Sequence, residues 1–91
     1  MVDINAIEKS IVAKLKERYG ASAVTAEYGA PMRFAINVVS DTFKDKPEDI
    51  RQDEVWELIK TNFPYSDFKY VGLVMTWTPE EKEAYDREQV A

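Results

Sequence analysis

Arg33-Phe-Ala-Ile-Asn-Val-Val-Ser-Asp-Thr-Phe43 is the stretch of sequence that decides the fold. Large apolar residues recur at every second position, Phe34, Ile36 and Val38, as in a β-strand with one buried face. Ser40-Asp41 then interrupts the pattern, because their short polar side chains can accept hydrogen bonds from nearby backbone N–H groups. The stretch therefore predicts a central strand that ends in a polar turn and leads into a helix.

A second strand is expected just before this one. Residues 23–28 alternate, with Val24, Ala26 and Tyr28 facing inward. Gly29-Ala30-Pro31 is typical of a turn. Since so few residues separate the two strands, we expect an antiparallel hairpin over residues 23–39.

Residues 68–77 predict a third strand with two largely apolar sides. One side would carry Phe68, Tyr70, Gly72, Val74 and Thr76, and the other Lys69, Val71, Leu73, Met75 and Trp77. Two apolar sides are unusual in a small sheet with helices on only one face. Either the terminal helix or a loop covers the second side, or that side contacts a partner or a second copy of the chain.

The flanking segments predict two helices that pack against the sheet. The first covers residues 4–19, begins at Asp3 or Asn5 as N-cap, and has apolar residues at helical spacing: Ile4, Ile7, Ile11 and Leu15. The second covers residues 48–62. A five-residue gap from Ile50 to Val55 breaks its apolar stripe, which indicates an interruption near Gln52-Asp53.

A third helix is predicted at the end of the chain. Thr78-Pro79-Glu80-Glu81 is typical of a capping box, in which Thr78 and Glu81 exchange hydrogen bonds with each other's backbone N–H. We expect this helix to run to about Arg87. It contains few apolar residues, so we expect its end to fray.

These elements predict one α+β domain over residues 1–91. The order is helix, strand, strand, helix (with a possible break), strand, helix. The passage from Val39 to Phe68 is long enough for a crossover that makes the last two strands parallel. We therefore expect a three-stranded mixed sheet with helices packed mainly on one face.

Composition excludes several kinds of chemistry. The 91 residues contain no Cys and no His, which removes thiolate nucleophiles, imidazole bases and the usual nitrogen or sulfur ligands for metals. Ser40-Asp41 consequently lacks the His that a nucleophilic triad needs. The net charge of −5 disfavours non-specific binding to phosphate backbones. With no long apolar run and no signal-like N-terminus, a cytoplasmic protein without a membrane partner is expected.

Three short segments together resemble the BolA-like family. The segment from Phe34 to Phe43 looks like the family's apolar strand that ends in Ser-Asp-x-Phe. Arg51, followed by Val55 and Leu58, is similar to the helix that carries the family's Arg-His pair. Thr78-Pro79-Glu80-Glu81 matches the family's closing motif. The resemblance implies a fold similar to class II KH domains, a link to monothiol glutaredoxins and iron–sulfur clusters, and DNA binding in some members.

The chain departs from that family at the residues that would bind a cluster. Gln52 stands where the family has His after the Arg, and Tyr70 stands where a second His often lies. The loop after the first strand, Gly29-Ala30-Pro31-Met32, carries neither His nor Cys. Cluster iron requires thiolate or imidazole. We therefore expect no cofactor and no metal bound by this chain.

Our leading hypothesis is a non-enzymatic adaptor that works by protein contact. Its partner would be another protein, such as a monothiol glutaredoxin, or a second copy of the chain. The candidate contact residues are Arg51, Gln52, Tyr70, Leu73, Met75 and Trp77.

The alternative hypothesis is a KH-like, DNA- or RNA-binding regulatory domain. The Gly-x-x-Gly loop of KH domains is absent from the sequence. Stacking on bases needs exposed aromatic residues near basic ones, and since Phe34, Phe43 and Phe63 fit core patterns, we expect this combination only from Lys69, Tyr70, Trp77 and Arg33.

Overall fold

The computed structural model describes residues 3–29 and 33–90, and it shows an α+β fold. Its elements follow in the order α1 (Ile4–Tyr19), β1 (Val24–Gly29), β2 (Arg33–Val39), the 3₁₀ turn η1 (Asp41–Phe43), α2 (Glu48–Asn62), α3 (Tyr65–Phe68), β3 (Val71–Trp77) and α4 (Pro79–Val90). The turn expected at residues 29–31 lies largely outside the described residues.

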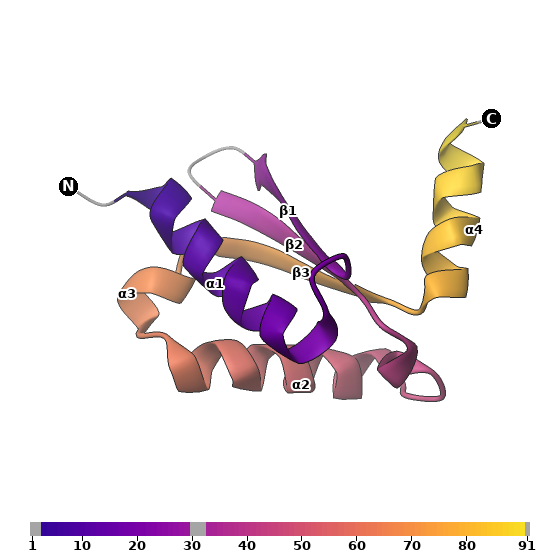
Figure 1. The fold of residues 1–91 in the computed structure, drawn as a ribbon, viewed down its shortest axis with the longest axis horizontal. Helices are drawn as coiled ribbons and strands as arrows, with labels where there is room; N and C mark the ends of the chain where they lie inside the picture. The colour runs from indigo at the N-terminus through magenta and orange to yellow at the C-terminus, as the bar shows by residue number, and fades with distance from the viewer. Residues whose placement is uncertain (1–2, 30–32, 91) are drawn as a thin grey trace.

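The three strands form one mixed sheet in the order β1-β2-β3 (Figure 1). β1 and β2 are antiparallel, with Ala26 opposite Ile36. β2 and β3 are parallel, with Ile36 opposite Val74. The predicted hairpin and the predicted parallel pairing are both confirmed, and β2 is the central strand.

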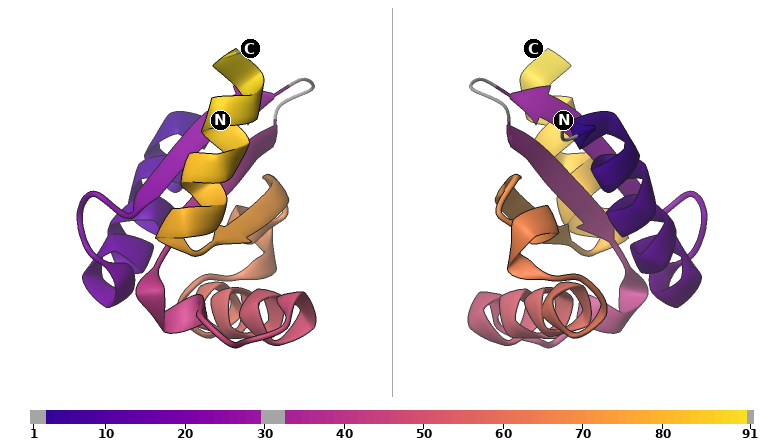
Figure 2. Two further views of the ribbon diagram at one scale, coloured as in Figure 1. Left: turned by 90° about the vertical axis from the view of Figure 1, so that its right-hand side faces the viewer. Right: turned by 90° about the vertical axis from the view of Figure 1, so that its left-hand side faces the viewer.

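The core lies between one face of the sheet and the helices α1 and α2, which occupy the same side (Figure 2). Phe34, Ile36 and Val38 of β2 are each at most 1% exposed. Ile11 and Leu15 of α1 and Val55 and Ile59 of α2 cover them. Asp3 caps α1, since its carboxylate accepts a hydrogen bond from the backbone N–H of Ala6 at 3.1 Å.

α2 is continuous through Gln52-Asp53, so the predicted break is wrong. The buried stripe consists of Arg51, Val55 and Ile59, which are spaced four residues apart. Ile50, which set the irregular gap in the sequence pattern, is 47% exposed and lies off the stripe. The gap disappears because a charged residue, Arg51, occupies the position expected for an apolar one.

The third strand begins later than predicted, at Val71 rather than Phe68. Phe68 ends the short helix α3, whose start follows Pro64. Lys69 directly follows α3 and also lies outside the strand. The alternation that the sequence shows over residues 68–70 therefore does not belong to a strand.

A β-bulge at Gly72 changes which side chains of β3 face the core. Phe34 pairs with Val71, but the next residue of β2, Ala35, pairs with Leu73, so Gly72 is the extra residue. The prediction that Val71 shares a side with Leu73 is wrong, because one extra residue reverses the alternation. Val71 is 6% exposed and belongs to the core, together with Val74 and Thr76.

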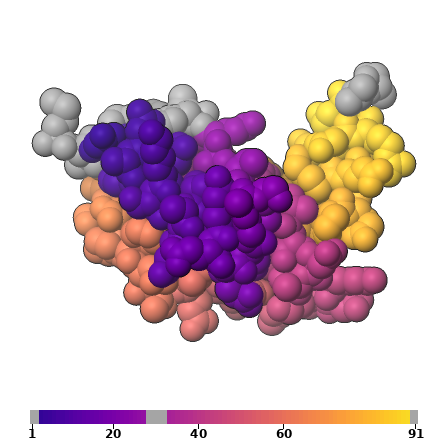
Figure 3. All heavy atoms as spheres, viewed as in Figure 1, coloured from indigo at the N-terminus to yellow at the C-terminus, as the bar shows by residue number. Residues whose placement is uncertain are grey.

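α4 begins with the predicted capping box. The backbone N–H of Thr78 donates to Glu81 Oε1 at 2.9 Å, and the N–H of Glu81 donates to Thr78 Oγ1 at 3.2 Å. The helix extends to Val90 rather than ending near Arg87. It projects from one end of the molecule (Figures 1 and 3), and it contacts the sheet mainly through β3.

Candidate functional site

The sheet face opposite α1 and α2 is only partly covered. Register pairs Ala35 with Leu73, Asn37 with Met75 and Val39 with Trp77. These six residues form the surface that we call the open sheet face. Leu73 is 51% exposed, and Met75 is half-buried. The predicted orientation of Leu73, Met75 and Trp77, away from the core helices, is what the structure has.

Trp77 lies at the end of the open sheet face that is next to the start of α4. Its ring lies 5.0 Å, centroid to centroid, from the ring of Tyr85 in α4. Its indole N–H donates to Asn37 Oδ1 at 3.0 Å, and Lys82 Nζ lies 5.5 Å from the centre of its ring. α4 therefore shields Trp77 but leaves Leu73 in solvent.

Arg51 and Gln52 lie in a different place, where the start of α2 meets β3 and α4. Arg51 is 8% exposed. Its Nη1 donates to Glu81 Oε1 at 2.7 Å, Nη2 to Glu81 Oε2 at 3.3 Å, and Nε to the carbonyl oxygen of Lys46 at 2.8 Å. Through these bonds the guanidinium of Arg51 connects α4 to the loop before α2.

The ion pair between Arg51 and Glu81 shifts the pKa of each residue in the direction that favours its charged form. The hydrogen bond from Arg51 is the main reason that the pKa of Glu81 lies below its usual range, and the bond from Thr78 adds to the effect. The same bond raises the pKa of Arg51 above its ordinary value. Opposite charges in contact stabilise each other's ionised forms.

Gln52 uses its amide to join α2 to β3. Its Nε2 donates to the carbonyl oxygen of Val74 at 2.8 Å and to Glu48 Oε1 at 2.9 Å. Thr76 Oγ1 donates to the same Glu48 oxygen at 2.9 Å. Arg51 and Gln52 thus stabilise the contact between helices and sheet, and their proposed contact with a partner stays a prediction.

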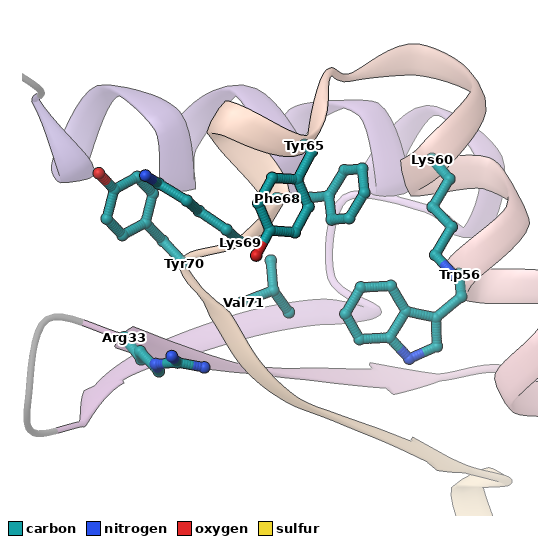
Figure 4. Close-up of a pocket in the computed structure, with 8 residues that line it drawn as sticks. All are labelled: Arg33, Trp56, Lys60, Tyr65, Phe68, Lys69, Tyr70 and Val71. Carbon is teal, nitrogen blue, oxygen red and sulfur yellow. The ribbon is translucent and has the colours of Figure 1, made fainter.

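Tyr70 lies in a third place, at a pocket beside the start of β3 (Figure 4). The pocket has a volume of about 630 Å³, and α2, α3, β2 and β3 all contribute to it. We call it the aromatic pocket, and its lining residues are Arg33, Trp56, Lys60, Tyr65, Phe68, Lys69, Tyr70 and Val71. The six candidate contact residues therefore do not form one site.

Sequence reasoning missed most of the aromatic pocket. It singled out Arg33, Lys69 and Tyr70 as basic and aromatic neighbours, and the structure brings these together. It also grouped Trp77 with them, although Trp77 lies on the open sheet face. The spacing of Trp56 and Lys60 could have indicated part of this pocket, because residues four apart on a helix share one side. In the structure, Lys60 Nζ lies 5.7 Å from the centre of the Trp56 ring.

Within residues 3–29 and 33–90, no cluster of three or more acidic side chains could hold a metal ion. None of the helices in these ranges has the length and hydrophobicity that crossing a bilayer requires.

Comparison with solved structures identifies the architecture. BolA1 from Arabidopsis thaliana superimposes with a TM-score of 0.61 at 16% identity, covering 82% of this chain and 94% of that one. The fold is BolA-like. A bol-like protein from Babesia bovis superimposes with a TM-score of 0.56 at 22% identity, covering 96% of both chains. No protein-family model and no curated protein matches the sequence.

Within this BolA-like fold, the residues at the expected ligand positions do not fit an iron–sulfur cluster. At position 52 the side chain is an amide, which supplies neither a thiolate nor an imidazole, and its Nε2 donates to the carbonyl oxygen of Val74. Tyr70 does not lie with Gln52 but lines the aromatic pocket. The function proposed for this chain therefore uses no iron–sulfur cluster bound by its own residues.

Proposed function

We propose that this protein is a non-enzymatic adaptor whose open sheet face binds a protein partner. The observation that carries the proposal is Leu73, a large apolar side chain that is 51% exposed on a β-strand, beside half-buried Met75. Exposed apolar surface on a sheet is typical of interaction sites. The BolA-like fold supports a partner of the monothiol glutaredoxin type, and a second copy of the chain is the other partner to test.

Burial of Leu73 provides the driving force for such a contact. Transferring a leucine side chain from water into an interface contributes roughly 1.5–3 kcal/mol. Ala35 and Met75 lie beside it in the sheet and extend the apolar area. A glutaredoxin-type partner would then be held by surface contact, because the chain has no thiolate or imidazole to share a cluster. The single domain and the cytoplasmic location expected from the sequence remain part of this proposal.

The test replaces Leu73 with Ser and measures association. We expect Leu73→Ser to weaken binding to a monothiol glutaredoxin, or self-association, by about tenfold or more, since 1.4 kcal/mol corresponds to a factor of ten. Calorimetric titration measures the first and sedimentation measures the second. Thermal unfolding should change little, because surface substitutions usually alter stability by about 0.5 kcal/mol or less.

Ile50→Ser is the matched control, because Ile50 is 47% exposed but lies on α2, away from the open sheet face. Adding Trp77→Gln to Leu73→Ser should weaken association further. A Leu73→Ser protein that unfolds at much lower temperature without any change in association would show that the face belongs to the core. Equal loss of binding in the Leu73 and Ile50 variants would also contradict the proposal.

A further inference from the structure

The aromatic pocket combines aromatic and basic side chains, the two kinds that contact the bases and phosphates of nucleotides. Among the residues that the structure describes, its lining contains four aromatic residues and three basic residues, and no acidic residue. The chain as a whole carries 17 acidic and 12 basic residues, so this composition is the reverse of the average surface. Figure 4 shows the rings and the basic side chains arranged around the same space.

Three of the four aromatic rings, those of Tyr65, Phe68 and Trp56, form a connected wall. Phe68 packs edge to face against Tyr65, with centroids 5.4 Å apart and planes at 90°. Trp56 contacts the other side of Phe68, at 6.4 Å and 74°. Edge-to-face pairs hold rings in fixed orientations. Tyr65 is nevertheless 69% exposed, so part of this wall faces solvent.

Within the described ranges, 3–29 and 33–90, the three basic residues of the pocket are not used in ion pairs. Among the residues that the structure describes, none of the salt bridges involves Arg33, Lys60 or Lys69. Lys60 and Lys69 lie over the rings of Trp56 and Tyr70, with Nζ 5.7 and 5.3 Å from the ring centres. The charges are thus held at the pocket but not neutralised by carboxylates.

Arg33 reaches this pocket from the neighbouring strand because of Gly72. A Cβ added at Gly72 would lie 3.2 Å from Arg33 Cβ and 3.5 Å from Arg33 Cδ. The missing side chain therefore lets the stem of Arg33 lie directly against the bulge. In Figure 4, Arg33 lies at the same end of the pocket as Tyr70, and Val71 lies between Arg33 and the ring of Trp56.

We propose that the aromatic pocket binds a nucleotide unit, with the base against the rings and the phosphate beside Lys60. Both halves of that ligand have counterparts in the pocket: a planar base stacks on exposed aromatic rings, and unpaired lysines attract phosphate. The volume of about 630 Å³ lies in the range of small-molecule sites, about 300–1,000 Å³. The acidic remainder of the surface disfavours a long polynucleotide track.

The site is independent of the adaptor function, because it uses other residues than the open sheet face. Each of the two surfaces carries one of the chain's two tryptophans, so one spectrum can observe both surfaces separately. Trp56 lines the aromatic pocket, and Trp77 lies on the open sheet face with its indole N–H bonded to Asn37. Their indole N–H signals in a proton–nitrogen NMR spectrum therefore report each surface by itself.

The experiment titrates the full chain with adenosine monophosphate, adenosine, inorganic phosphate and a short single-stranded oligoadenylate. We expect the monophosphate to shift the Trp56 indole signal and to leave that of Trp77 unchanged. Adenosine and phosphate should each bind at least about tenfold more weakly, since each lacks one half of the recognised ligand. The oligoadenylate arm distinguishes a free nucleotide from a nucleotide within a strand, according to which of the two binds more tightly.

Three variants test the assignment of each half of the ligand. Lys60→Gln should weaken binding of the monophosphate about tenfold, as expected for loss of one hydrogen bond to a charged group. Tyr65→Ser, on a side chain that is 69% exposed, should weaken it about fivefold or more through lost stacking. Lys44→Gln removes the same charge as Lys60→Gln at an exposed residue outside the pocket, and should leave binding unchanged.

Several results would overturn the proposal. One is the absence of any shift of Trp56 with both the monophosphate and the oligoadenylate. Another is phosphate binding as tightly as the monophosphate, which would leave the rings without a role. Equal weakening by Lys44→Gln and Lys60→Gln would show that net charge, rather than the pocket, determines binding.

Discussion

Arg51 is the residue that connects the helices to the end of the sheet. It occupies the apolar stripe of α2, one turn before Val55, and is 8% exposed. A buried guanidinium without partners would be strongly destabilising, and Glu81 and the carbonyl oxygen of Lys46 supply them. Spacing in the sequence cannot show this, because Glu81 lies 30 residues further along the chain. The periodicity of apolar residues therefore treats a charged residue at this position as a gap in the apolar stripe of α2.

The first residue-scale prediction concerns the charge of Glu81. Its pKa is lowered in the folded chain, so its contribution to stability is present above the ordinary carboxyl pKa of 4.5 and is lost as the pH falls through the lowered value. Glu81→Gln keeps an acceptor for the capping box but removes the charge. Because the Glu81 side chain is 47% exposed, we expect a loss of only about 1 kcal/mol at neutral pH.

Thermal unfolding at neutral pH and at successively lower pH tests this expectation. The difference between the unaltered chain and Glu81→Gln should shrink as the pH falls from 4.5 through the lowered pKa of Glu81, where the carboxylate of the unaltered chain becomes neutral as well. Glu80→Gln, which removes the same charge one residue earlier, should cause little change at either pH. A difference between the unaltered chain and Glu81→Gln that stays constant with pH would assign the effect to the cap instead of the ion pair.

At the scale of elements, features set by neighbouring residues could be predicted from the sequence, whereas features that depend on contacts between distant segments could not. α1, the capping box of α4 and the hairpin follow from caps, turns and periodicity within a few residues, and the sequence predicts them. α3 is a four-residue helix, too short for periodicity to reveal. The bulge in β3 had one local signal, since a glycine inside a strand pattern often marks a bulge. Its effect on Val71 depends on pairing with β2, which only the fold supplies.

The bulge leads to the element-scale prediction. Deleting Gly72 would leave Val71 opposite Phe34 and Leu73 opposite Ala35 in a regular ladder, so every remaining side chain of β3 could keep its present side. We expect the deletion to cost well below the roughly 1.5–3 kcal/mol that one buried apolar side chain contributes to the free energy of unfolding, because none of the buried side chains has to change sides. Urea denaturation measures it.

Gly72→Ala is the matched control for that deletion. It keeps the extra residue, and the added Cβ requires only that Arg33 move slightly, so we expect a cost below about 1 kcal/mol. A deletion that costs as much as a buried apolar side chain, or more, would show that β3 shifts its register when Gly72 is removed and would contradict this expectation.

At the scale of the whole molecule, the open sheet face could be predicted, whereas the aromatic pocket could not. Leu73, Met75 and Trp77 belong to one strand, so alternation alone places them together. The aromatic pocket draws on β2, α2, α3 and β3, with Arg33 and Val71 far apart in the chain. Periodicity assigns faces within an element, but it does not say which faces of different elements meet.

The BolA-like fold leads to a last prediction, about what the chain does with a glutaredoxin. If the fold alone were sufficient for cluster binding, a mixture of this chain with a monothiol glutaredoxin would form a shared iron–sulfur cluster. We expect no such species, because the chain offers neither thiolate nor imidazole and Gln52 already donates its amide to Val74. The visible absorbance of a reconstituted glutaredoxin should be the same with and without this chain, while calorimetry still detects contact through the open sheet face. Zinc titration of the isolated chain should likewise show no binding. A new cluster absorbance band that disappears when Gln52 or Tyr70 is replaced would contradict this expectation, and it would show that an amide or a phenol can act as a ligand in this fold.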